Sequence, residues 1–118
     1  MMDDDPDRPA ILVSLAREVD ERLYGWIAVG AEEEGIPCRR VPAEDTDTAA
    51  IAYTAARNSR LGVGIGVASG QVAVHERHMP AERPVVATAV EEAHAKDTCR
   101  SAGSNAARLV IGVPLQLE

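Results

Sequence analysis

Aromatic side chains are scarce in this 118-residue chain, which has one Trp, two Tyr and no Phe. This scarcity disfavours a stacking platform for single-stranded nucleic acid, and it means that the core must be built from Ala, Val, Ile and Leu. Positive charge is also in deficit, because 12 Lys and Arg stand against 19 Asp and Glu, which gives a net charge of −7. Such a chain repels phosphate backbones, so we expect no nucleic-acid partner.

Long apolar runs and cysteines are few as well. No segment approaches the ~18 apolar residues that are needed to span a bilayer, so we expect no membrane partner. The two cysteines, Cys38 and Cys99, fit a reduced cytoplasmic protein better than a disulfide scaffold. The first residues are acidic, so residues 1–8 are predicted to form a disordered tip and residues 9–118 a single α/β domain.

The rest of the chain alternates short apolar runs with segments of helical spacing. These patterns predict strands at 10–15, 37–41, 61–68, 71–75 and 84–89, and helices at 20–34, from about 46 to 59, and at 97–110. Asp20 is the expected cap of the first helix, and Gly35 its C′ residue. Asp45 or Thr46 is the expected cap of the second helix.

The order of these elements predicts an α/β fold. The two-residue turn Ser69–Gly70 makes the third and fourth strands antiparallel. Strands that are joined through a helix pair in parallel, with right-handed crossovers. We therefore expect a mixed five-stranded sheet between two helical layers.

Three alternating glycines, Gly62, Gly64 and Gly66, lie in the third predicted strand. A dinucleotide site needs the spacing G-x-G-x-x-G in a turn that opens a helix, and this segment has neither the spacing nor the helix. On a period of two, the glycines share one face that a helix can approach closely. We favour close packing over a ligand site, and the same face or the last helix could also pair the chain with a second copy.

Metal and nucleophile motifs are weak. His75 and His78 form an H-x-x-H pair, but zinc needs three or four protein ligands, and His94 or Cys99 could join only through the fold. A solvated hairpin end is the favoured interpretation. Cys38 precedes two arginines that could lower its pKa, yet nothing else supports covalent catalysis, and no serine lies in a G-x-S-x-G elbow. A structural or incidental thiol is therefore favoured over a catalytic one.

Three consecutive glutamates, Glu32, Glu33 and Glu34, close the first predicted helix. Negative charge at a helix C-terminus opposes the macrodipole and costs ~0.3–1 kcal/mol per group at low salt. Carboxylates are also the hard oxygen ligands that Mg²⁺ and Ca²⁺ prefer. Taken alone, the triplet is best interpreted as a solvated charged face.

The most specific string is Gly103-Ser104-Asn105-Ala106-Ala107-Arg108-Leu109-Val110. Ser104 or Asn105 is predicted to cap a break in the last helix near Gly103. Arg108 would then project from a surface of small residues. The string fits a tightly packed helix, or a contact face on which Asn105 and Arg108 fix the register of a partner.

Together these strings resemble the small (beta) subunit of the diol/glycerol dehydratase-reactivating factor, a family of chaperone-like complexes that serve adenosylcobalamin-dependent dehydratases. The resemblance extends from Pro9 to Pro114. It depends on Glu32-Glu33-Glu34-Gly35-Ile36-Pro37, Val63-Gly64-Ile65, Val74-His75 with Met79-Pro80-Ala81, and the string at 103–110 with Gly112 and Pro114. The chain departs from the family pattern at Ser104, Ile111 and Leu115, and around the turn at 67–70.

The resemblance implies a fold like that of the dehydratase medium subunit, with strand order 2-1-3-4-5, strand 4 antiparallel, and the sheet order of anticodon-binding domains. It implies a large partner subunit with an actin-like ATPase domain. Glu33 matches a family glutamate that reaches a Mg²⁺ ion of that subunit, and no cofactor is expected on this chain alone. Glu32, Glu34, Asn105 and Arg108 are the implied partner-binding residues.

The implied mechanism is subunit exchange. The small subunit gives way to the dehydratase medium subunit, the dehydratase loosens, and damaged cobalamin leaves. Two alternatives remain at this stage: the medium subunit of the dehydratase itself, or a fragment of it, and a stand-alone module of the anticodon-binding type, which the charge of −7 opposes. The composition and the two cysteines predict a cytoplasmic protein, and association with a bacterial microcompartment is a further option.

Overall fold

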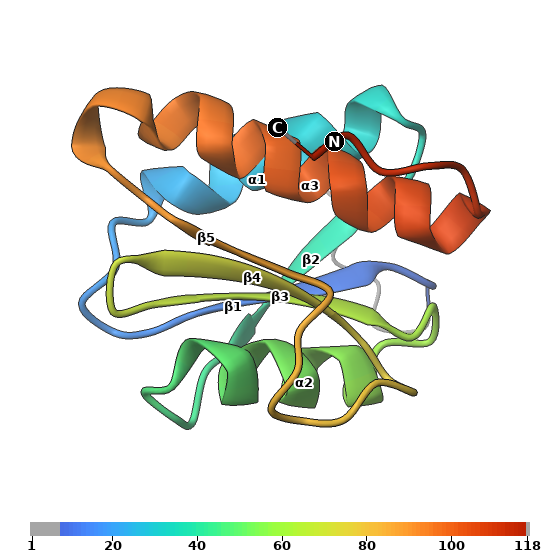
Figure 1. Ribbon diagram of the computed structural model, residues 1–118, viewed down its shortest axis with the longest axis horizontal. Helices are drawn as coiled ribbons and strands as arrows, with labels where there is room; N and C mark the ends of the chain where they lie inside the picture. Colours follow the sequence, from blue (N-terminus) through green and yellow to red (C-terminus); the bar gives the residue numbers. More distant parts are fainter. Residues whose placement is uncertain (1–7, 118) are drawn as a thin grey trace.

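The computed structural model describes residues 8–117, so residues 1–7 of the predicted acidic tip lie outside the described residues. Numbered along the chain, the five strands lie in the sheet in the order 2-1-3-4-5, as the resemblance implied. The elements are β1 (Ile11–Leu15), α1 (Arg22–Glu33), β2 (Cys38–Pro42), α2 (Thr48–Asn58), β3 (Val63–Ala68), β4 (Gln71–Glu76), β5 (Val86–Ala89), a 3₁₀ turn (Glu92–His94) and α3 (Ala95–Ile111). Helices α1 and α3 cover one face and α2 the other, which gives the predicted three layers (Figure 1).

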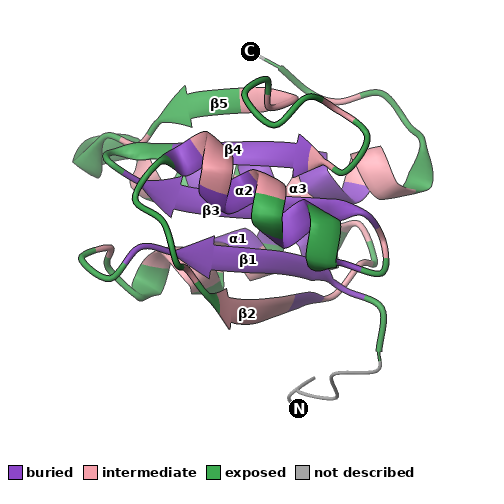
Figure 2. Ribbon diagram, turned by 90° about the horizontal axis from the view of Figure 1, so that it is seen from below, coloured by how far each residue is buried: buried purple, intermediate pink, exposed green. Residues whose placement is uncertain are grey.

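The centre of the sheet is the most apolar part of the chain. All residues of β1 and β3 are buried, which is what parallel strands covered on both faces require. Strand β1 pairs in parallel with β2 and β3, and β4 runs antiparallel to β3 and β5. Ser69 and Gly70, with φ of 53° and 73°, form the predicted tight turn of the β3–β4 hairpin. Exposure rises toward β5, which lies at one edge (Figure 2).

Helix α2 lies directly on β3 because two of the strand glycines have no side chain. A Cβ at Gly64 would collide with the backbone of Ala55 and Ala56, and one at Gly66 would lie 2.6 Å from the amide nitrogen of Ala52. The expected close packing is therefore confirmed, and α2 leaves no room there for a second copy. Gly62 departs from the prediction: it precedes the strand at a φ of 76°, beside the Arg77 side chain.

The opposite face uses glycine in the same way, but between two helices. A Cβ at Gly30 of α1 would collide with the carbonyl of Arg100, and a Cβ at Gly103 of α3 would collide with the carbonyl of Ile27. The predicted helix break near Gly103 is wrong, because α3 continues from Ala95 to Ile111. The glycine is needed for helix contact, so Ser104 and Asn105 are helix-interior residues and not caps.

The helix ends show two further corrections. Asp47, rather than Asp45 or Thr46, caps α2, because its side chain accepts the amide of Ala50 at 3.0 Å. Asp20 precedes the actual N-cap of α1, Glu21, although its carboxylate accepts the Arg22 amide at 2.9 Å. Gly35 is confirmed as the C′ residue of α1: its φ is 88°, and its amide bonds to the Glu32 carbonyl.

Candidate functional site

The acidic end of α1 meets a polar row on α3. Arg100 donates from Nη2 to Oε2 of Glu33 at 2.5 Å. One turn further along α3, Ser104 donates its hydroxyl to Oε2 of Glu34 at 2.8 Å. One more turn along, Arg108 donates from Nε to the same oxygen at 3.2 Å. We call these five residues the α1–α3 rim.

The rim explains how the chain tolerates the glutamate triplet. Carboxylates at the C-terminal end of α1 oppose its macrodipole. Arg100, Ser104 and Arg108 recur every four residues, so they form one stripe along α3 and bring two cations to these carboxylates. Arg108 and Glu34 are each 23% exposed in their side chains, so this pair is shielded more than the Arg100–Glu33 pair, which is 40% and 49% exposed. Glu32 stays exposed beside the rim.

The rim offers one reachable carboxylate rather than a complete metal site. Among residues 8–117, no three His, Cys, Asp or Glu side chains come together to hold a metal ion. Glu33 lines a shallow hollow of about 300 Å³ whose other walls are Asp97, Arg100, Ser101, Ser104 and Gln116, all of them polar. A half-exposed hard oxygen beside a polar hollow fits a Mg²⁺ ion whose other ligands come from elsewhere.

Asn105 lies next to the rim but is directed away from it, toward the C-terminal segment. It is 5% exposed, its Oδ1 accepts the amide of Gln116 at 2.8 Å, and its Nδ2 donates to the carbonyl of Gln116 at 3.1 Å. Arg108 donates from Nη1 to the carbonyl of Pro114 at 3.1 Å. The two residues that the sequence assigned to a partner thus hold the chain's own tail, residues 113–117, and a role in partner binding stays a prediction.

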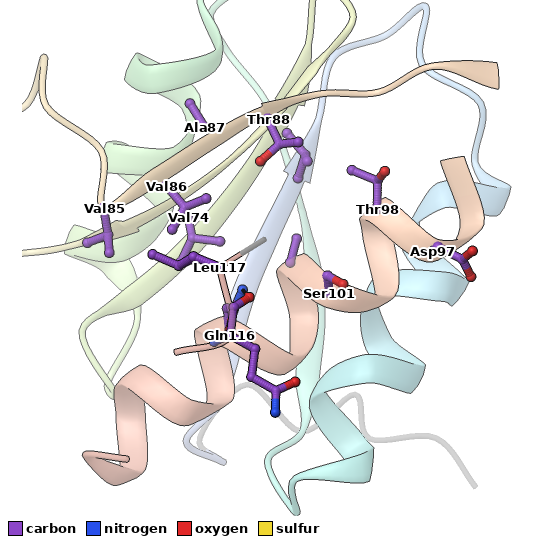
Figure 3. A pocket seen from close by; sticks show the side chains of 13 residues that line it. Val74, Val85, Val86, Ala87, Thr88, Asp97, Thr98, Ser101, Gln116 and Leu117 are labelled. Carbon is purple, nitrogen blue, oxygen red and sulfur yellow. Dashed lines mark hydrogen bonds between the residues drawn. The ribbon is translucent and has the colours of Figure 1, made fainter. Parts of the chain in front are cut away.

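The tail borders an apolar groove between α3 and the outer strands. The groove has a volume of about 470 Å³ and is lined by valines of β4 and β5, by polar side chains of α3 and by the tail. Figure 3 shows Leu117 beside Val74 and Val86, with Ser101 and Thr98 on the opposite wall. Leu117 is still 64% exposed, so the tail covers the groove only in part.

His75 is not at a solvated hairpin end, as the sequence suggested, but is fully buried. Its ring lies 5.1 Å from that of Tyr53 in α2. The amide of Glu76 donates to its Nδ1 at 3.0 Å, and its Nε2 lies 3.0 Å from the carbonyl oxygen of Ala81. His78 instead pairs with Glu76 at 2.7 Å. The H-x-x-H pair is therefore divided between two structural contacts.

The cysteines are buried and unpaired with each other. Burial raises the pKa of the Cys38 thiol to about 12, with a smaller contribution from the charge of Glu32, and burial raises the pKa of Cys99 to about 11. The proposal that the neighbouring arginines could lower the Cys38 pKa is wrong, because desolvation dominates. The favoured interpretation, a structural thiol, agrees with this environment.

Arg100 and Ser104 are rim residues that the sequence did not assign. Their spacing with Arg108 could have identified them, since residues four apart share one face of a helix. The signal was missed because the expected break near Gly103 placed Arg100 in a different segment. Once α3 is continuous, these three residues and the glutamate triplet of α1 come together.

Known proteins match nearly the whole chain. The family model described as dehydratase medium subunit matches residues 8–116. A propanediol dehydratase-reactivating factor small subunit of Citrobacter freundii is 37% identical over 109 residues, covering 92% of this chain and 90% of that protein. The protein of the same name in Salmonella typhimurium is 34% identical over 117 residues, covering 98% and 97%.

Two solved structures share the fold. A glycerol dehydratase reactivase chain superposes with a TM-score of 0.83 at 31% identity, over 93% of this chain and 98% of that one. A second, from a diol dehydratase-reactivating factor described as complexed with ADP and Mg²⁺, has a TM-score of 0.81 at 32% identity, over 94% and 100%.

No helix within residues 8–117 has the length and apolarity required to cross a membrane. Identity above 30% over nearly full length, together with the same fold, settles the family. The chain belongs to the dehydratase medium-subunit family and is a homologue of the small subunits of diol and glycerol dehydratase-reactivating factors.

Proposed function

We propose that this chain is the non-catalytic small subunit of a factor that reactivates an adenosylcobalamin-dependent diol or glycerol dehydratase by subunit exchange. One observation carries the proposal: the chain matches a family model for the dehydratase medium subunit over residues 8–116, while its full-length relatives are reactivating-factor small subunits. A surface related to both subunits can compete for one binding face. Exchange then needs only a difference in affinity between the two competitors.

We assign to Glu33 the contact with the metal ion of the large subunit. The large subunit is expected to carry an actin-like ATPase domain, and a Mg²⁺ ion there would supply charge neutralisation for the bound nucleotide. The half-exposed carboxylate of Glu33 lies at the rim and lines the polar hollow, so it is accessible to a metal ion bound by another subunit. It is flanked by Glu32, Glu34 and Arg108. Glu34 is less available to a partner, because its carboxylate already accepts hydrogen bonds from Ser104 and Arg108. The chain alone then binds no cofactor.

The exchange step is tested by following the subunits. The factor is incubated with ATP, Mg²⁺ and dehydratase that carries damaged cobalamin. The large subunit is then captured by an affinity tag, and the bound small partners are identified by mass spectrometry. We expect cobalamin in the filtrate, and the dehydratase medium subunit on the large subunit in place of this chain.

A cross-linked factor is the matched control for this test. With this chain covalently joined to the large subunit, ATP hydrolysis should continue while cobalamin release stops. Cobalamin release from the cross-linked factor at the normal rate would exclude exchange, and no release from either form would exclude a reactivating role.

The medium subunit of an active dehydratase is the second candidate, because the matching family model carries that description. Copurification separates the two functions. A complex that shows the cobalamin absorption spectrum and dehydratase activity would support this alternative. A colourless complex of two subunits that hydrolyses ATP would support the reactivating factor.

A further inference from the structure

Arg100 reaches Glu33 from a firmly fixed backbone. Its carbonyl lies against Gly30 of α1 so closely that a Cβ at Gly30 would collide with it. The base of the Arg100 side chain therefore has a set position relative to the C-terminal turn of α1. From there its Nη2 donates to Oε2 of Glu33 at 2.5 Å.

The contact uses one oxygen of the carboxylate. Oε2 accepts from Arg100, while the Glu33 side chain keeps 49% of its surface exposed and borders the polar hollow. Within residues 8–117, the Nε of Arg100 is buried without an acceptor, so Glu33 is the acceptor that orients this guanidinium. A glutamate held in this way loses less rotamer freedom when a partner binds than one that is free in solvent.

We propose that Arg100 is a positioning residue that holds Oε2 of Glu33 so that Oε1 is presented to the Mg²⁺ ion of the large subunit. This inference rests on the proposed function of Glu33. Two effects oppose each other here, since the fixed carboxylate favours metal binding while the positive charge of Arg100 disfavours a nearby cation. Because Arg100 is bonded to Oε2 and would leave Oε1 to the metal, we expect positioning to outweigh repulsion.

The test measures the affinity of the chain for the large subunit, by biolayer interferometry, in Mg²⁺ and in EDTA. The quantity of interest is the ratio of the two affinities, which a merely structural change would leave unaltered. Arg100→Gln removes the guanidinium, and Glu33→Gln removes the metal ligand while keeping an amide oxygen for Arg100. Lys96→Gln, on the exposed first turn of α3, is the matched control for loss of one positive charge.

We expect Arg100→Gln to lower the Mg²⁺/EDTA affinity ratio by about two- to fivefold, in the range of a partly exposed ion pair. Arg100→Lys should recover part of the loss, and Lys96→Gln should leave the ratio unchanged. Melting temperatures of the isolated variants show whether each is folded. If Arg100→Gln does not fold, Arg100→Lys is compared with the wild type in its place.

The outcomes separate this inference from the function on which it rests. A wild-type affinity that is equal in Mg²⁺ and EDTA would refute both the metal role of Glu33 and the role of Arg100. A Mg²⁺ dependence that Glu33→Gln abolishes and Arg100→Gln leaves intact would refute the role of Arg100 alone. A higher ratio in Arg100→Gln would show that Arg100 competes with the metal, which also overturns the proposal.

Discussion

On both faces of the sheet, glycines allow the backbones of packed elements to come into close contact. Only on the α1–α3 face does this contact lie beside a cluster of charged side chains. On the α2 face, Gly64 and Gly66 let a helix rich in Ala lie directly on β3. On the other face, Gly30 and Gly103 bring α1 and α3 into backbone contact. There the close approach also aligns Glu33 with Arg100 at the end of α1. Tight packing is structural on both faces, but on the α1–α3 face it also positions the candidate site.

Breaking the α1–α3 contact should have the largest effect on stability. In Gly103→Ala the new methyl group would meet the Ile27 carbonyl, a backbone atom that cannot rotate away. We expect a loss of about 3 kcal/mol in the free energy of unfolding, at the upper end for an overpacked site. Urea titration followed by circular dichroism measures it, and affinity for the large subunit should fall as the rim shifts.

Gly25→Ala is the control for this substitution. Gly25 lies in the same helix pair, but a Cβ there has nothing within 4 Å. Alanine should then stabilise the protein by about 0.5–1 kcal/mol through helix propensity. If the two substitutions changed stability equally, the helix contact would not be the reason for glycine at 103.

The matching substitution on the other face is Gly64→Ala. Its Cβ would collide with the backbone of Ala55 and Ala56, and α2 can yield only by moving off the sheet. We expect a loss of about 2 kcal/mol from overpacking. The Mg²⁺/EDTA affinity ratio of the folded variant should nevertheless equal that of the wild type. A lowered ratio would show that the two faces are not separable.

A smaller change is expected where α3 holds the tail. Asn105→Ala removes both hydrogen bonds to the backbone of Gln116, and the freed groups can turn to water. The expected cost is about 1–2 kcal/mol for the two hydrogen bonds together, since an ordinary hydrogen bond contributes about 1 kcal/mol net or less at such a partly exposed tail. Hydrogen exchange by mass spectrometry should show faster exchange in the tail and unchanged exchange in α2. Unchanged exchange in the tail would mean that Leu117 and Arg108 suffice to hold it.

The fold was predictable from this sequence because its signals are local. Apolar runs, the Ser69–Gly70 turn and the Gly35 stop fix the elements and their order, and the family resemblance gave the strand order. The site was predictable only in part. The glutamate triplet and Arg108 were identified, but whether a helical glycine such as Gly103 breaks a helix or packs it depends on a partner helix far away in sequence. The same long-range packing buries His75 and directs Asn105 to the tail.

A pH-dependent effect is expected from the buried thiols of the α1–α3 face. Cys38 and Cys99 both belong to the core cluster that packs under α1 and α3. Burial raises the pKa of Cys38 from 9.0 to about 12, so the folded state holds this proton more tightly than the unfolded state does. The resulting stability is complete below pH 9 and is lost as the pH rises from 9 toward 12, at most about 1.4 kcal/mol per pH unit. Urea titrations at pH 8 and pH 10 should show a smaller loss in Cys38→Ala than in the wild type, whereas an equal loss would show that Cys38 is not the source of the alkaline sensitivity.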